Sequence, residues 1–237
     1  MSEGRSPALD AMLVDLDDRL VRARGSDAAF AGRYWRHAAG DDLHTRRADD
    51  VAGLMLAHLD LARSRADGTV AIDVFTPTVA EHGWATGHTV VQIVAEDMPF
   101  LVDSVVAALA RHDMTGHEVV HPVMLVRRDA VGQLLAVVDE DPPPRALRAP
   151  DQRVESWIHI EVRRDTDPVV LRALAGELRR VLRDVSECVQ DYAKMRRQAL
   201  DVADSILTAS LPVPDREAVS YTHLTLPTTS ALCRGRG

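Results

Sequence analysis

The chain has 237 residues, which suits one or two domains, and 46% of them are hydrophobic, enough for a packed core. Its formal net charge of −8 argues against nucleic acid or an anionic membrane as the main partner. Two cysteines exclude a disulfide framework, no apolar run is long enough to span a membrane, and the first residues lack a signal peptide, so we expect a cytoplasmic protein.

The first 67 residues show the 3–4 spacing of amphipathic helices. One apolar stripe ends before Gly25, and a second helix carries three aromatic residues. A third helix begins near Ala48, runs through Ala62 and is stopped by Asp67 and Gly68. His58 lies on the third stripe, where we interpret it as a packed or rim histidine. We therefore expect residues 1–67 to form a small helical segment.

The next part of the chain changes to the two-residue period of strands. In chain order, the expected elements are strands over 70–75 and 89–94, a helix that starts at Pro99, strands over 118–128, 134–138 and 154–162, and helices over 168–185 and 186–207. The order β-β-α-β-β-β-α indicates an α+β domain over residues 68–210, in which helices cover one face of an antiparallel sheet. Pro122 predicts an edge or a bulge in its strand.

Strand 154–162 has the clearest alternation. One face carries Val, Ser and Ile, and the other carries Glu155, Trp157, His159 and Glu161. This pattern indicates one face toward the core and one wet face. An exposed Trp on a strand also fits a domain interface, and the same face would equally fit under the N-terminal helices.

Residues 211–237 are predicted to be a disordered tail. Residues 219–224 correspond to the codons GTC TCT TAT ACA CAT CT, which resemble a transposon end used as a sequencing adapter. From residue 219 on, the amphipathic period stops and the composition shifts to Thr, Leu, Arg and Gly. We therefore interpret residues 219–237 as foreign sequence.

The sequence lacks the patterns of catalytic, cofactor and metal sites. No G-x-G precedes residue 219, so we expect no NAD or nucleotide site in this chain. His117 and His121 would lie about 13 Å apart along one strand, too far for one metal ion. Ser104 has no nucleophile elbow, and Cys188 stands among acidic residues, which do not activate a thiol.

One turn does suggest binding. Asp97, Met98, Pro99, Phe100 and Leu101 lead from a strand into a helix. The free N–H groups of the first helical turn can bind an anion such as an amino-acid carboxylate. The alternative is an ordinary strand-to-helix turn with an aspartate cap.

This turn resembles the first loop of ACT domains, which are small amino-acid-sensing modules of β-α-β-β-α-β, ferredoxin-like order. Asp97, Pro99 and Leu101 match the family pattern D-x-P-G-L, and Phe100 stands in place of the glycine. Because that glycine lets a ligand approach the backbone, Phe100 favours a structural role. If an effector binds, the resemblance implies residues 97–101 as its loop.

A second resemblance covers roughly residues 30–200. Strings over 34–36, 75–78, 81–84, 87–91, 97–105, 121–122, 155–159 and 194–195 are similar to the N-terminal region of large bacterial NAD-specific glutamate dehydrogenases. In that family this region holds ACT-like modules and serves regulation and oligomer assembly. A distant catalytic domain oxidises glutamate to 2-oxoglutarate and ammonia with NAD.

The resemblance implies a fragment without catalytic residues and without bound NAD, although the parent enzyme would use NAD. The implied partners are the remaining domains of the parent, other copies in a homo-oligomer and an amino-acid effector. The alternative is a free-standing ACT-like sensor or dimerisation module.

Overall fold

The structure is a computed structural model in which residues 7–24, 30–36, 43 and 46–208 are described. The chain divides into two compact units, Met1–Arg183 and Asp184–Gly237. The predicted tail over 211–237, with its adapter-like part, lies outside the described residues.

An antiparallel sheet forms the centre of the first unit. Its six strands are β1 (Ala71–Phe75), β2 (Thr89–Glu96), β3 (Gly116–Val120), β4 (Val123–Arg128), β5 (Leu134–Val138) and β6 (Gln152–Val162). They lie in the order β1-β2-β6-β4-β5. The remaining strand, β3, pairs with residues 159–162 of β6, and β4 pairs with residues 152–156 of the same strand. The two strands at the centre, β2 and β6, are buried on both faces over most of their length, which explains their high content of β-branched residues.

The predicted strand over 118–128 is two strands, β3 and β4, interrupted at residues 121–122. Pro122 has no N–H to donate, but its carbonyl accepts a hydrogen bond from the Trp157 N–H at 3.0 Å. The chain therefore stays attached to β6 across the break. Pro122 was predicted to mark an edge or a bulge within one strand, and the structure has a break between two strands there instead.

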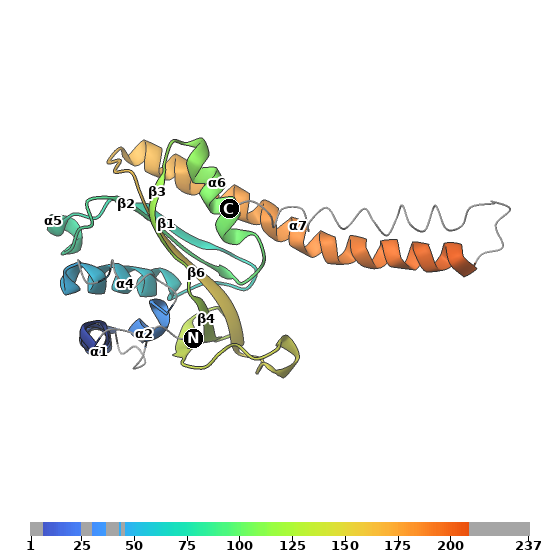
Figure 1. Ribbon diagram of the computed structural model, residues 1–237, viewed down its shortest axis with the longest axis horizontal. Helices are drawn as coiled ribbons and strands as arrows, with labels where there is room; N and C mark the ends of the chain where they lie inside the picture. The colour runs from blue at the N-terminus through green and yellow to red at the C-terminus, as the bar shows by residue number, and fades with distance from the viewer. Residues whose placement is uncertain (1–6, 25–29, 37–42, 44–45, 209–237) are drawn as a thin grey trace. The chain divides into compact units, whose positions relative to one another are not determined.

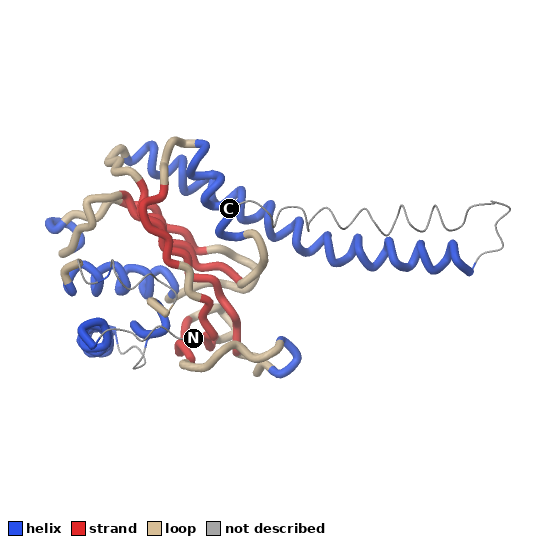
Figure 2. Tube along the Cα trace, viewed as in Figure 1, coloured by secondary structure: helices blue, strands red, loops and turns tan. Residues whose placement is uncertain are grey.

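Helices cover both faces of the sheet (Figures 1 and 2). On one face α4 (Ala48–Ala62) packs on β1 and β2, and α1 (Pro7–Arg24) contacts α4 and α2 (Phe30–Tyr34). On the other face lie α6 (Leu101–Arg111) and the first part of α7 (Pro168–Thr208). The α+β class, with an antiparallel sheet and helices, is confirmed. Two short helices, α5 (Val79–His82) and the 3-10 turn η1 (Arg145–Leu147), were predicted as loop.

The prediction that one face of β6 is exposed to water is wrong, and the alternative, that this face lies under the N-terminal helices, is confirmed. Trp157 is fully buried, and its ring lies 5.8 Å from the Phe30 ring and 5.2 Å from the His58 ring. The alternating polar residues of β6 therefore lie under the N-terminal helices. One apolar cluster runs from Leu16 of α1 to Trp157, across the predicted boundary after residue 67. That boundary stays a prediction about domain organisation.

The two helices predicted over 168–185 and 186–207 are one helix, α7, of 41 residues. After Gly176 its sequence contains no glycine and no proline, so nothing in it breaks the helix at residue 186. In the second unit the described residues are 184–208, where Tyr192 and Met195 are exposed. None of the helices that the structure describes combines the length and apolar composition needed to cross a membrane.

Candidate functional site

Asp97 of the predicted effector loop attaches that loop to β6. Its backbone N–H donates to the Val154 carbonyl at 3.0 Å, and its carboxylate accepts from the Ser156 hydroxyl at 2.6 Å. The N-cap of α6 is Phe100, which makes no side-chain cap bond. Asp97 therefore joins two strands instead of capping the helix, and its carboxylate already has a partner.

The other four loop residues lie in sequence around the start of α6. Phe100 adopts the left-handed conformation, with φ 71°, and its side chain is 61% exposed. Leu101 turns into the core, while Met98 is half-buried and Pro99 is exposed. None of the five lines either of two cavities, the one over His112, Met114 and Leu174 or the one over Arg33 and His121. The effector role of the loop stays a prediction.

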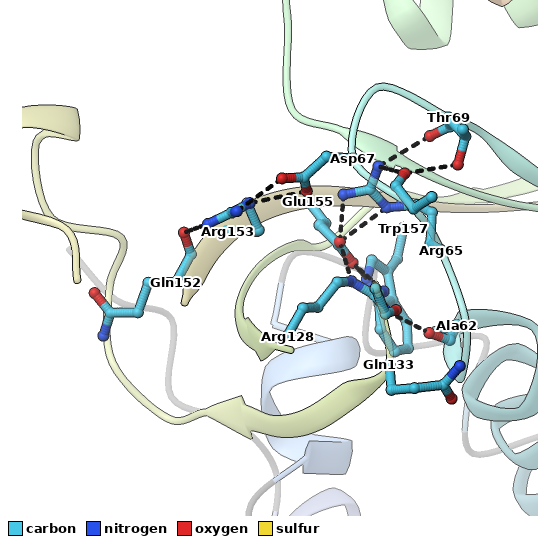
Figure 3. Close-up of polar contacts among 12 residues, drawn as sticks. Ala62, Arg65, Asp67, Thr69, Arg128, Gln133, Gln152, Arg153, Glu155 and Trp157 are labelled. Atoms are coloured by element: carbon cyan, nitrogen blue, oxygen red, sulfur yellow. Dashed lines mark hydrogen bonds and ion pairs between the residues drawn. The ribbon is translucent and has the colours of Figure 1, made fainter. Parts of the chain in front are cut away.

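A buried ion network ties the end of α4 to the sheet (Figure 3). Glu155 on β6 accepts from Arg65 at 2.7 and 2.9 Å and from Arg128 at 2.6 and 2.8 Å. The indole N–H of Trp157 donates to the same carboxylate at 3.2 Å. Burial acts to raise the pKa of Glu155, but the two guanidinium groups outweigh it and hold the pKa below its ordinary value.

The remaining donors of the two arginines bind backbone carbonyls. Arg128 donates to Ala62 at 2.9 Å and to Gly132 at 2.8 Å, and Arg65 donates to Thr69 at 2.9 Å. The network thus fixes the chain after α4 against the β4–β5 hairpin. The sequence analysis missed both arginines. The available signal was Trp157 on the same strand face as Glu155, since a large apolar ring favours burial and a buried carboxylate needs a cation.

A second ion network lies at the opposite end of β6. Glu161 accepts from Arg46 at 2.6 and 3.0 Å, and Arg46 also pairs with Glu118 of β3. His88 Nδ1 lies 3.2 Å and His159 Nε2 3.5 Å from the Glu161 carboxylate. Burial acts to raise the pKa of Glu161, but His159 and Arg46 outweigh it and lower the pKa to about 2.

Hydrogen bonds between uncharged groups also connect α4 with the sheet. The His58 ring lies between the Tyr34 hydroxyl, 2.7 Å from Nδ1, and the Ile93 carbonyl, 3.2 Å from Nε2. Gln92 on β2 donates to the Leu54 carbonyl of α4 at 2.9 Å. His58 is fully buried, as the packed-histidine interpretation expected.

Three histidines lie close together in the sequence, at positions 112, 117 and 121, but they have different surroundings in the structure. His112 pairs with Glu177 of α7, the His117 ring lies 4.6 Å from the His88 ring, and His121 lines a cavity at the β3–β4 break. Within the part of the chain that the structure describes, no three side chains of metal-binding type come together.

The described turns between strands and helices lack the glycines that are typical of a dinucleotide site. The turns that lead from a strand into a helix are residues 76–78, 97–100 and 163–167, and their sequences contain no glycine. A pyrophosphate needs glycines there because the backbone must approach it closely. The buried charges hold the helices on the sheet.

A family model described as "Glutamate dehydrogenase, ACT1 domain" matches residues 30–178. The chain belongs to this family. The ACT-type fold and the resemblance seen in the sequence strings are thereby confirmed.

Three curated relatives of this ACT1 chain carry the name "NAD-specific glutamate dehydrogenase". The one from Halomonas elongata is 33% identical over 224 residues, which is 92% of this chain and 14% of the relative. The one from Pseudomonas aeruginosa is 31% identical over 188 residues, 79% of the chain and 11% of the relative. The one from Mycobacterium tuberculosis is 27% identical over 166 residues, 69% of the chain and 10% of the relative. The chain thus spans about a seventh of the length of the first of these relatives and a smaller share of the other two.

Proposed function

We propose that the chain is the N-terminal regulatory and assembly region of an NAD-dependent glutamate dehydrogenase. The parent enzyme would convert L-glutamate, NAD and water to 2-oxoglutarate, ammonia and NADH, with a catalytic domain outside these residues. The observation that supports this most directly is the ACT1 match over residues 30–178, in a chain that aligns with 14% of a full enzyme.

The structure supports a non-catalytic role in two ways. The strand-to-helix turns provide no glycines for NAD, so this region is proposed not to bind the parent's cofactor. Glu155 and Glu161, the most buried carboxylates, have arginine partners and depressed pKa values, so neither is suited to accept a proton near neutral pH.

The first experiment compares three samples: the parent enzyme, the parent without residues 1–178, and the isolated chain. Sedimentation gives the mass of each assembly, and NADH absorbance follows glutamate oxidation with and without added amino acids. We expect the isolated chain to form no NADH. We also expect the deletion to change the assembly mass or the response to amino acids.

A point variant of the parent is tested as well, so that the result does not depend on whether the deleted parent folds. Leu200→Asp in the parent places a charge on an exposed apolar position of α7, and Asp201→Asn is its neighbouring control. NADH formation by the isolated chain would overturn the proposal. So would a deleted parent that folds and keeps both its assembly mass and its response to amino acids.

A further inference from the structure

The part of α7 that belongs to the second unit carries a seven-residue repeat of apolar side chains. In a coiled coil the seven positions are lettered a to g, and a and d are apolar. Here the a positions are Val185, Tyr192, Ala199 and Ile206, and the d positions are Cys188, Met195 and Val202. The stripe of an ideal straight helix drifts by about 20° per heptad from such a repeat. An uninterrupted repeat therefore favours a partner helix around which this helix supercoils.

This row of side chains is exposed in the second unit. Its continuation in the first unit is buried, where Leu174, at a d position, is 2% exposed. Beyond residue 184, Tyr192 is 49% exposed, Met195 63% and Val202 47%, and Cys188 is a free, exposed thiol. Large apolar side chains in one contiguous row are typical of a surface that binds another protein.

The rest of the segment limits it to one partner helix. The b, c and f positions between residues 186 and 204 are mostly polar: Ser186, Glu187, Gln190, Lys194, Arg197, Asp201 and Asp204, with Ala193 and Leu200 as the apolar exceptions. The helix thus has one apolar face and one polar face. A single apolar face can be covered by one partner helix while the polar face stays in water.

The charges beside the row select the orientation of a second copy. The g positions are Asp184, Asp191 and Gln198, and the e positions are Val189, Arg196 and Ala203. In a parallel pair, g of one helix faces e of the next heptad in the other, so Asp191 faces Arg196 of the second copy, twice by symmetry. In an antiparallel pair g faces g and e faces e, which brings acidic residues together and gives Arg196 no carboxylate. The segment is therefore complementary to itself in the parallel orientation.

We propose that residues 184–208 form a parallel coiled coil with the same residues of a second copy of this chain. Cys188 of one copy lies against Cys188 of the other at a d position, and Asp191 pairs with Arg196 on both flanks. Within the described part of the chain no ion pair uses either of these two charges, so both are available to the second copy. The proposal rests on the assembly role proposed above and adds the element, its partner and the orientation.

Reversal of the charges tests the contact between copies. Sedimentation of the full chain at rising concentration, up to about 1 mM, measures the dimer. Asp191→Arg brings like charges together on both flanks and should weaken the dimer about ten-fold, as should Arg196→Asp. The two changes combined should restore the dimer, because they reverse each pair. Residues five apart on one helix do not face each other, so restoration requires a contact between two copies.

A pair of glutamate variants tests the apolar row. Met195→Glu places a charge between the helices and should leave the chain monomeric at every concentration tested. Arg197→Glu introduces the same side chain two residues further on, at an f position, and should keep the dimer. Both positions are exposed, so the fold should tolerate both changes, and circular dichroism of each variant checks this.

Cys188 reports the register of the two helices. Cys233→Ser removes the other cysteine of the sequence. In that background the oxidant diamide takes up the two thiol hydrogens, and a disulfide joins two copies if their Cα atoms at residue 188 come within about 7 Å. We expect this cross-link to form in the dimer and to be lost with Met195→Glu.

Four results would each overturn the proposal. They are a chain that stays monomeric up to about 1 mM, a dimer that Met195→Glu leaves intact, a double charge variant that is no stronger than the single ones, and a dimer that diamide does not cross-link. The deletion that tests the proposed function removes residues 1–178 and keeps residues 184–208. Either proposal can therefore fail without the other.

Discussion

Arg128 binds both oxygens of the Glu155 carboxylate, with Nε 2.6 Å from Oε1 and Nη2 2.8 Å from Oε2. Both side chains are buried, and Arg65 shares Oε1 at 2.7 Å. One carboxylate therefore faces two guanidinium groups inside the protein. The backbone carbonyls of Ala62, Gly132 and Thr69 accept the donors that remain.

We expect Glu155→Gln to destabilise the fold by about 3–5 kcal/mol, because it leaves two buried cations without a counter-charge. Urea unfolding measures the loss. Asp67→Asn is the matched control, since its partner Arg153 lies near the surface. Surface ion pairs contribute little, so the control should lose far less stability. Equal losses in the two variants would show that the Glu155 network does not hold the layers together.

Gly132 takes part in the same network through its backbone. Its carbonyl accepts from Arg65 N–H at 2.9 Å and from Arg128 at 2.8 Å, and its φ is 88°. A Cβ at this position would lie 2.3 Å from the Arg65 carbonyl oxygen. The hairpin backbone cannot move away without breaking these hydrogen bonds.

Gly132→Ala should therefore cost more than the roughly 1–2 kcal/mol of left-handed backbone strain alone. Gly68→Ala isolates the strain, because Gly68 has φ 72° and open space where the Cβ would stand. Unfolding free energies of both variants, measured in urea, give the difference. If Gly132→Ala is no worse than Gly68→Ala, the close approach to Arg65 is not maintained in solution.

Local patterns in the sequence were sufficient to predict most elements of the first unit. The period of two located the strands, and the stripe with His58 predicted α4. Pro122 indicated an irregularity in the strand over 118–128, although not its division into β3 and β4. These features depend on neighbouring residues, which a single sequence displays directly. The helix over 168–208 was predicted in two parts, although no glycine or proline lies near residue 186.

Contacts between distant residues were not predictable in the same way. The face of β6 with Glu155 and Trp157 looked wet because charged residues alternate along it. Its partners, Arg65 and Arg128, are 90 and 27 residues away in sequence. Alternation reports which residues share a face, and it does not report what covers that face. The candidate loop was located as a turn, yet the partner of Asp97 on β6 lies 59 residues further on.

Phe100 has the left-handed conformation that favours glycine, and its ring is mostly exposed. Phe100→Gly removes about 1–2 kcal/mol of strain and adds about 0.5–1 kcal/mol of backbone entropy cost, so we expect equal or slightly higher stability. Phe100→Val should be destabilised, because a β-branched residue tolerates this conformation poorly. Phe100→Ala controls for loss of the ring. Thermal unfolding that ranks Val above Gly would contradict the strained turn.

His58 connects two layers as a neutral ring. Because the Ile93 carbonyl can only accept, Nε2 carries the proton and Nδ1 accepts from the Tyr34 hydroxyl. Burial and, to a smaller extent, nearby His159 lower the pKa of His58 from 6.5 to about 3, against the effect of the Ile93 carbonyl. The unfolded chain therefore binds a proton at this residue between pH 6.5 and 3, and the folded chain does not.

This difference makes stability depend on pH in a defined direction. The contribution of His58 is present above pH 6.5 and is lost as the pH falls toward 3, with a slope of at most about 1.4 kcal/mol per pH unit. Glu161 acts in the same direction, but only below its ordinary pKa of 4.5. Urea unfolding between pH 7 and pH 5 therefore avoids Glu161 and measures His58 together with His121, whose pKa is also lowered by burial.

His58→Gln should flatten that slope, since a glutamine can donate to Ile93 and accept from Tyr34 without titrating. His82→Gln, at a partly exposed position of α5, controls for the loss of an imidazole and should keep the slope. A slope that persists in His58→Gln would assign the proton to another group. A flat profile in the unmodified chain would mean that His58 is protonated in the fold, which the Nε2–Ile93 and Nδ1–Tyr34 geometry does not allow without turning the tyrosine hydroxyl.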